Sequence, residues 1–162
     1  MPKKLEKMLD QITDSQLMTL LGQKMVNRII DRTQNKKKDV ELKTFKKYSK
    51  AYFDKKRKGN LYRQAEQFAP KKRSDVTLTL TGDMLNSLQV KEAKDTSVLI
   101  GFNPEGSIKA NQNQAMGRAI STERNPVTKK DAKFIEDFFN KEITKAFEET
   151  SGTIKIDIGK IT

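Results

Sequence analysis

The sequence predicts an α+β fold in which a small antiparallel sheet is covered by one helix from each half of the chain. Apolar residues recur at helical spacing over residues 14–34 and again over 128–150, whereas apolar and polar residues alternate over 76–81. A chain of 162 residues is long enough for one domain with a hydrophobic core of its own. We therefore expect a single domain, 1–162, that also carries long loops and a long basic excursion.

The N-terminal part, residues 1–35, is expected to contain two helices. A short amphipathic helix precedes the helix at 14–34, for which the segment Thr13-Asp14-Ser15 offers capping side chains. Gly22 inside the second helix costs up to about 1 kcal/mol relative to alanine, and we expect a close contact with the sheet as its structural reason. The apolar stripe of this helix is interpreted as core, and a groove for a partner is the alternative.

Residues 74–102 have the densest local pattern and are predicted to form the sheet. Apolar residues alternate with threonines over 76–81, Gly82 ends that strand, and Asp83 is a suitable N-cap for a short helical turn. A polar link, 91–97, is expected to join the next two strands as a hairpin loop. The three expected strands include residues 76–81, 88–90 and 98–102.

The second half of the chain is expected to form a long loop, a helix and a final strand. Residues 103–127 are rich in Gln, Asn, Ser and Gly, and we interpret them as the long loop. Thr128 and Asp131 match a capping box that starts the helix at 128–150, and alternation over 153–161 predicts the final strand. The predicted core residues are Leu80, Leu85, Leu88, Ile100, Phe134 and Phe138.

Positive charge is concentrated in one segment of the chain. The protein has a formal net charge of +12, and residues 36–73 hold 15 basic and 4 acidic residues. A local field of this size suggests nucleic acid or an acidic protein surface as partner. Phe45, Tyr48 and Tyr52 are spaced to share one helical face, so either the aromatics anchor a helix whose lysines are solvated, or the lysines meet a partner. The candidate partner-facing or DNA-facing residues are Lys46, Lys47, Lys50, Lys55, Lys56, Arg57, Lys58, Lys71, Lys72 and Arg73.

The composition argues against an enzyme, a cofactor and a structural metal. Cysteine and histidine are both absent, which removes disulfides, thiol nucleophiles, the usual zinc sites and imidazole acid–base chemistry. A carboxylate enzyme that uses Asp83 or Asp95 is a third hypothesis, although Asp83 fits a helix cap better. No apolar run is long enough to span a bilayer, so we expect a soluble, cytoplasmic protein with no membrane partner.

Several short motifs, taken in order, resemble one family. Phe45–Tyr52 reads F-x-x-Y-S-x-x-Y and is followed by the pair Lys55-Lys56. An alternating strand is followed by a Thr-Gly-Asp-Met-Leu turn, and the hairpin ends in Ile-Gly-Phe. Further on come the pairs Lys109-Ala110 and Gly117-Arg118. Over about residues 14–145 this order is similar to the virion-morphogenesis proteins of tailed bacteriophages, which are the tail-completion or neck proteins of the head–tail junction. The family's Asp-Gly turn before the first motif and its histidine after the hairpin are absent here.

The resemblance implies a structural protein without turnover that forms a homo-oligomeric ring, a head–tail connector, at the head–tail interface. Its partners would be other neck, portal-proximal and tail proteins, with DNA passing through the ring. The implied location is the neck or tail of the virion, after assembly in the host cytoplasm. Whether such a subunit closes the head, or completes or terminates the tail, stays open. The alternative is a basic nucleic-acid-binding module outside the virion. The residues expected in a subunit-contact loop are Lys109, Asn111, Gln114, Gly117 and Arg118.

Overall fold

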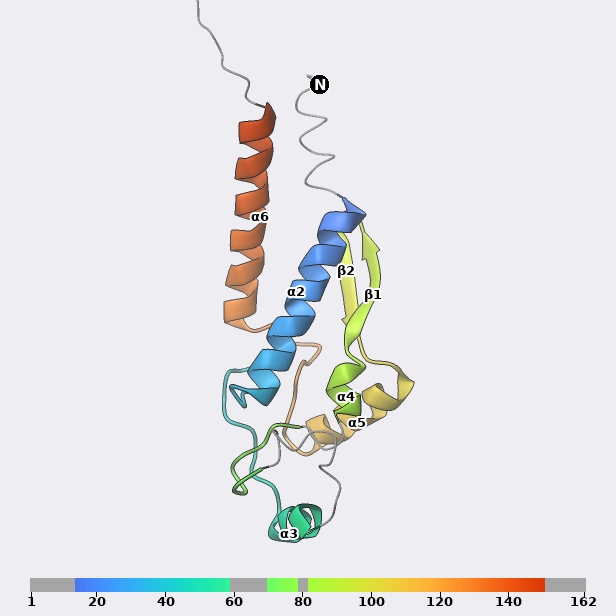
Figure 1. Ribbon diagram of the computed structural model, residues 1–162, viewed down its shortest axis with the longest axis vertical. Coiled ribbons are helices and arrows are strands. Elements are labelled where there is room, and N and C mark those ends of the chain that lie inside the picture. The colour runs from blue at the N-terminus through green and yellow to red at the C-terminus, as the bar shows by residue number, and fades with distance from the viewer. Residues whose placement is uncertain (1–13, 59–69, 79–81, 151–162) are drawn as a thin grey trace, which may run out of the picture.

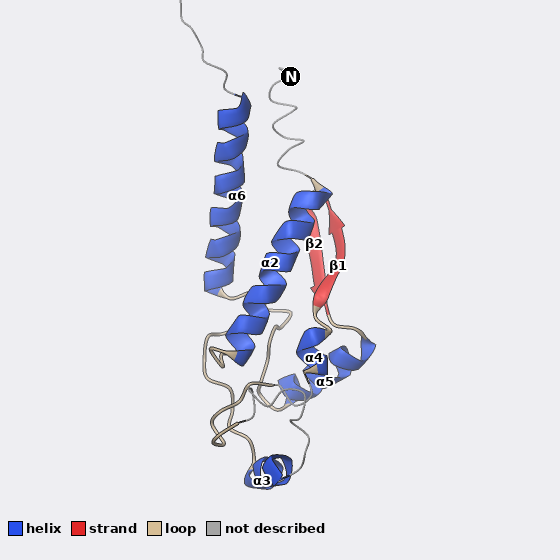
Figure 2. Ribbon diagram, viewed as in Figure 1, coloured by secondary structure: helices blue, strands red, loops and turns tan. Residues whose placement is uncertain are grey.

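The computed structural model describes residues 14–58, 70–78 and 82–150. The sheet has two antiparallel strands, and an N-terminal and a C-terminal helix flank it (Figure 2). The predicted α+β class is therefore confirmed. In chain order, the elements are α2 (Ser15–Gln34), α3 (Lys50–Lys58), α4 (Asp83–Asn86), β1 (Gln89–Lys94), β2 (Ser97–Gly101), α5 (Pro104–Ala115) and α6 (Lys129–Thr150).

The molecule is elongated, and α6, α2 and the β1–β2 hairpin lie side by side along its long axis (Figure 1). Helix α2 lies between the β1–β2 hairpin and α6, while α4 and α5 lie at the end of the hairpin that is nearer to α3. Helix α3 marks one end of the molecule, and α6 extends toward the other. The buried apolar side chains form two separate clusters, one along α2 and one around α4.

The first cluster joins α2 to α6 and to the sheet. Met18, Leu21 and Met25 of α2 are buried with Phe138 of α6. The helix begins where the sequence predicts, because the side chain of Asp14 accepts a hydrogen bond from the backbone N–H of Gln16 at 2.9 Å. The apolar stripe of α2 is therefore core. Around this cluster pack the half-buried residues Leu17, Ala93, Val98, Ile100, Phe134, Ile135 and Phe139.

Gly22 allows α2 to approach the sheet closely. A Cβ at this position would lie 2.6 Å from Cγ2 of Val90 and 2.7 Å from Cγ2 of Val98. Close-packed interiors do not tolerate carbon atoms at such distances without a shift of the neighbours. The predicted reason for a glycine inside this helix, a close contact with the sheet, is confirmed.

The hairpin is longer than the sequence pattern indicated. Lys94 pairs with Ser97, so the turn contains only Asp95 and Thr96, and the polar link predicted at 91–97 is mostly strand. The sequence pattern did not reveal this strand because its side chains are mostly polar. The pairing is made by backbone N–H and C=O groups, which every residue of the hairpin carries, so it does not depend on an apolar pattern. The paired residues are Gln89 with Gly101, Val90 with Ile100, Glu92 with Leu99, Ala93 with Val98 and Lys94 with Ser97.

The strand predicted at 76–81 is not formed by its described part, 76–78. Leu78 has a φ of 53°, in the left-handed region, and this interrupts the extended backbone that a strand requires. Val76 and Leu78 are nevertheless buried, in the second apolar cluster. The pattern therefore predicted the burial of Val76 and Leu78 correctly, but Thr77 between them is buried as well, and these three residues form no strand.

The helical turn α4 starts at a glycine and not at the predicted aspartate. Gly82 is the N-cap, with a φ of 90° that glycine adopts without strain. Asp83 is the first helical residue, and its carboxylate lies 3.3 Å from Nζ of Lys109. The predicted capping role of Asp83 is wrong, since the left-handed conformation needed at the cap favours its neighbour.

Helix α5 occupies the first half of the segment predicted to be a long loop, 103–127. The side chain of Asn103 accepts from the backbone N–H of Gly106 at 2.7 Å, and Pro104 occupies the first turn. Gly106 is the one buried residue of this helix. The helix buries little apolar surface, and its sequence accordingly shows no apolar stripe. The prediction of a loop was therefore wrong over the residues of α5.

Helix α6 begins with the predicted capping box. The backbone N–H of Asp131 donates to Oγ1 of Thr128 at 3.0 Å, and this hydroxyl donates to the Asp131 carboxylate at 2.7 Å. Among the predicted core residues, Leu85, Leu88 and Phe138 are buried, and Ile100 and Phe134 are half-buried. The predicted first helix before residue 14, the core role of Leu80 and the final strand at 153–161 lie outside the described residues.

We predict that Gly22→Ala destabilises the protein, although alanine is the better helix former. The added methyl group would overlap Val90 and Val98, and overpacking of this kind costs about 1–3 kcal/mol. Urea unfolding measures the change, with Gln23→Ala on the exposed side of the same helix as the control. The further substitution Val90→Ala should recover part of the loss. A stabilised Gly22→Ala variant would contradict the close helix–sheet contact.

Candidate interaction surface

A buried arginine holds the start of the basic segment. The guanidinium of Arg118 donates from Nε to the carbonyl oxygen of Lys46 at 2.9 Å and from Nη2 to that of Lys47 at 3.2 Å. Its Cζ also lies 5.0 Å from the centre of the Tyr48 ring. Arg118 is only 7% exposed. It is therefore largely internal to the protomer, where it holds the backbone of this segment, and its role in a contact between subunits stays a prediction.

The lysines of this segment are presented outward as a consequence. Phe45 and Tyr48 are buried in the second apolar cluster, and the residues between them, Lys46 and Lys47, are exposed. The aromatic residues therefore anchor the segment, as one of the two readings predicts. They do not share a helical face, because α3 begins only at Lys50 and residues 45–49 before it form no helix.

The part of the basic segment around Tyr48 lies beside the end of the segment at Arg73. Tyr48 and Arg73 exchange backbone contacts, since the N–H of Tyr48 donates to the Arg73 carbonyl at 3.0 Å and Nε of Arg73 donates to the Tyr48 carbonyl at 2.8 Å. Lys71, Lys72 and Arg73 are exposed like Lys46, Lys47 and Lys50. The structure thus brings these six predicted basic residues to one end of the molecule. Of the predicted residues Lys55, Lys56, Arg57 and Lys58, the structure describes the backbone of α3 alone.

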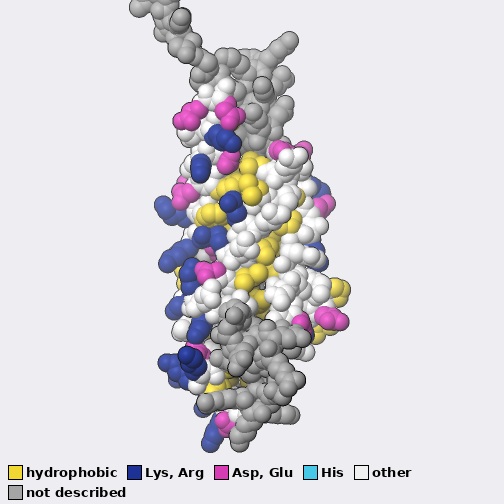
Figure 3. Space-filling model, viewed as in Figure 1, with side chains coloured by type: hydrophobic (Ala, Val, Ile, Leu, Met, Phe, Trp, Pro, Cys, Tyr) yellow, Lys and Arg dark blue, Asp and Glu magenta, His cyan; other side chains and the backbone are white. Residues whose placement is uncertain are grey.

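An ion pair joins the start of the same segment to the residues just after its end. Nζ of Lys37 contacts the carboxylate of Asp75, which also accepts from the backbone N–H of Lys71 at 3.2 Å. The hydrogen bond from Lys37 holds the pKa of the Asp75 carboxyl below its ordinary value. Figure 3 shows Lys and Arg side chains gathered along one edge of the molecule, on the side where α6 lies in Figure 1.

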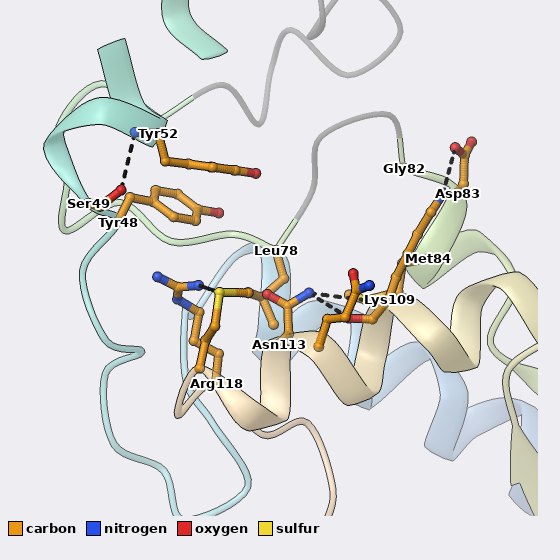
Figure 4. Close-up of a pocket in the computed structure, with 12 residues that line it drawn as sticks. Tyr48, Ser49, Tyr52, Leu78, Gly82, Asp83, Met84, Lys109, Asn113 and Arg118 are labelled. Atoms are coloured by element: carbon orange, nitrogen blue, oxygen red, sulfur yellow. Dashed lines mark hydrogen bonds and ion pairs between the residues drawn. The ribbon is translucent and has the colours of Figure 1, made fainter. Parts of the chain in front are cut away.

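A cavity of about 410 Å³ lies beside this segment (Figure 4). The rings of Tyr48 and Tyr52 form part of one wall and lie with their centres 5.0 Å apart. Burial raises the pKa of the Tyr52 phenol. On the opposite wall, Nδ2 of Asn113 donates to the Lys109 carbonyl at 2.9 Å. The cavity is lined by Tyr48, Ser49, Tyr52, Leu78, Gly82, Asp83, Met84, Lys109, Gln112, Asn113, Met116 and Arg118.

The residues predicted to form a subunit-contact loop lie on α5 and on the turn that ends it. Asn111, Gln114 and Gly117 are exposed, and Lys109 is half-buried at the cavity. Sequence reasoning missed the apolar part of this cavity, which includes Leu78, Met84 and Met116. No sequence pattern pointed to it, because its walls come from three separate parts of the chain.

A buried carboxylate joins α2, α6 and the segment between α5 and α6. Asp131 accepts from Nε of Arg28 and from Nη1 of Arg32, both at 3.0 Å, and from the Thr128 hydroxyl. Nη2 of Arg32 donates to the carbonyl oxygen of Ile120 at 2.6 Å. Burial lowers the pKa of the Arg32 guanidinium, whereas the Asp131 charge acts in the opposite direction. Only 6% of the Asp131 side chain is exposed.

A second hollow, of about 530 Å³, lies over this buried carboxylate and has several cations in its wall. Three of its cations are paired with carboxylates of the wall, because Arg28 and Arg32 both contact Asp131 and Lys36 contacts Asp31 at 2.5 Å. Lys38 and Lys130 also line the hollow, so its cations outnumber its carboxylates and it keeps a net positive charge.

No group of three or more acidic side chains in the described part of the chain could hold a metal ion. None of the described helices is long and apolar enough to cross a membrane. Asp83 and Asp95 lie on different elements, α4 and the hairpin turn, and both are exposed.

Comparison of the chain with family models, with curated protein sequences and with solved structures gives no match.

We predict that Asp131→Asn strongly destabilises the fold. The amide has the shape of the carboxylate but no charge, so Arg32 would remain buried without a counter-ion, which typically costs about 3–5 kcal/mol. The matched control is Asp31→Asn, whose ion pair with Lys36 is exposed and should contribute less than about 1 kcal/mol. Equal denaturation midpoints for the two variants would show that the buried carboxylate does not stabilise the fold.

Proposed function

We propose that this chain is a structural subunit of a tailed-phage virion, a neck or tail-completion protein that forms a ring at the head–tail interface. It would act by assembly and without turnover. Subunits would join side by side, and their exposed segments would seal the junction between portal-proximal proteins and the tail. The localisation that follows is the virion, reached after assembly in the host cytoplasm.

One observation carries this proposal. The motifs on which the family resemblance rests are far apart in the sequence, yet residues from four of them line the same cavity. They are the aromatic segment, the turn after Leu78, the lysine of α5 and the glycine–arginine pair. Motifs that converge in space are better explained by one shared site than by four chance matches. The contributing residues are Tyr48, Ser49, Tyr52, Gly82, Asp83, Met84, Lys109 and Arg118.

Two large apolar side chains are exposed in the protomer. Leu99 is 58% exposed on β2, and Ile108 is 59% exposed on α5. A neighbouring subunit that covered either side chain would bury apolar surface. With only 35% hydrophobic residues, the chain has a modest core, and further apolar burial on assembly would add to its stability.

The second candidate is a nucleic-acid-binding module outside the virion. The observation in its favour is the row of exposed basic residues that Arg118 and Tyr48 hold in place, which includes Lys46, Lys47 and Lys50. Such a module would bind DNA or RNA directly. The logarithm of its affinity would fall with the logarithm of salt concentration, by about 0.9 for each neutralised phosphate of duplex DNA.

The test replaces Lys46, Lys47 and Lys50 by glutamine in the phage that carries the gene. We expect filled heads and free tails to accumulate unjoined, because the altered surface no longer meets its neighbour, while the melting temperature of the purified protein stays within a few degrees. Electron microscopy of lysates and DNA-binding assays on purified protein measure the two properties.

The control replaces three lysines that are exposed elsewhere on the molecule, Lys24, Lys91 and Lys133, by glutamine. This variant has the same net charge and should assemble normally. Normal particles in the first variant, together with a large loss of nucleic-acid binding, would reject the neck role and favour the second candidate.

A further inference from the structure

We infer that the cavity beside Tyr48 and Tyr52 is a docking site for an acidic segment of an adjoining protein, which inserts one apolar side chain. The inference rests on the proposed function, because it names the chemistry of the partner that the same surface would receive. It goes further in assigning the contact to a defined cavity and in specifying both the charge of the partner segment and its anchor.

The lining of the cavity is suited to an apolar side chain. Leu78, Met84 and Met116 supply aliphatic and thioether surface, and the tyrosine rings supply aromatic surface. Methionine side chains adapt to differently shaped partners because they are unbranched and polarisable. A volume of about 410 Å³ is at the low end of the range for small-ligand pockets, so it fits one large side chain with its flanking backbone.

The mouth of the cavity already exposes apolar surface to solvent. Met116, which lines the cavity and is the C-cap of α5, is 47% exposed. A partner that covered this side chain would gain about 25 cal/mol for each Å² of apolar surface that it buried. The cavity and this rim together have the arrangement of an apolar centre with a partly exposed edge.

The charges around the cavity favour an acidic partner. Lys109 lines it, and Lys50 directly follows Ser49, which also lines it. Lys46 is close as well, because its Cδ lies 3.8 Å from the position of a Cβ on Gly117, the residue before Arg118. Asp83 is the acidic residue in the cavity wall. Its carboxylate is already paired with Lys109, whose Nζ lies 3.3 Å away.

The arrangement of the rings argues against single-stranded nucleic acid as the occupant. Stacking of a base needs an open aromatic face. In Figure 4 the Tyr48 ring lies between the Tyr52 ring and the Arg118 guanidinium, so both of its faces are covered. Nucleic acid is therefore an outcome that the experiment must be able to detect.

The experiment selects ligands for the purified, full-length protein from an unbiased library of short displayed peptides. We expect the enriched peptides to carry several Asp or Glu residues around one Phe, Leu or Trp. Fluorescence anisotropy then gives their affinities for the parent and for variants, with a single-stranded oligonucleotide measured in parallel. Replacement of the central apolar residue by serine in a selected peptide should weaken binding at least about ten-fold.

Two pairs of variants place the binding on the protein. Met116→Glu and Lys109→Glu should each lower peptide affinity about ten-fold or more, because each puts negative charge at the cavity. Their controls, Leu99→Glu and Lys91→Glu, make the same changes at exposed positions of the sheet and should leave the affinity unchanged. A peptide whose acidic residues are changed to lysine should regain affinity for Lys109→Glu, which loss of folding could not explain.

The inference is overturned if no peptide is enriched, if the enriched peptides are neutral or basic, or if both controls weaken binding as much as the cavity variants. It is also overturned if the oligonucleotide binds and the cavity variants abolish that binding. None of these measurements uses a virion. If the peptide-binding tests fail but substitution of Lys46, Lys47 and Lys50 still blocks particle assembly, the docking site is rejected and the neck role stands. If the peptides bind as expected but particles assemble without this protein, the docking site stands and the neck role is rejected.

Discussion

The arrangement of the helices depends on one buried carboxylate, that of Asp131. It compensates the charge of Arg32, and Arg32 in turn donates to the carbonyl of Ile120, a residue of the second apolar cluster. One set of contacts therefore connects the two clusters of a thin, elongated molecule. A buried pair is stabilising only while both partners are present, because either charge alone would be left desolvated. Asp131 also belongs to the capping box, so the start of α6 and its position against α2 are fixed together.

A second buried arginine, Arg118, connects this part of the fold to the basic segment. Arg118 lies two residues before Ile120 and donates to the carbonyls of Lys46 and Lys47. Because the backbone of this stretch is held from inside, its lysine side chains are exposed as a row with little freedom of the main chain. Fixed positive charges of this kind give a partner a defined surface, although the charges repel one another in the isolated protein.

The sequence predicted local structure well where a physical rule acts within a few residues. The capping box of α6 and the need for Gly22 against the sheet are examples. It failed where long-range contacts override local pattern: Leu78 is buried without being in a strand, and α5 is helical without an apolar stripe. The exposed lysines could be predicted from composition. The cavity could not be predicted, because its walls meet only after folding. The internal position of Arg118 could not be predicted either, because arginine has the chemistry of a surface residue.

The central claim is that the basic end of the molecule meets acidic protein in an assembled particle. Zero-length carbodiimide cross-linking tests it most directly, because the reagent joins a lysine amine to a carboxylate only when the two are in contact. In particles that contain this protein, mass spectrometry should find Lys46, Lys47, Lys50 or Lys109 joined to Asp or Glu of a different protein. The claim is contradicted if these lysines form no such links while lysines elsewhere, such as Lys24 and Lys133, do.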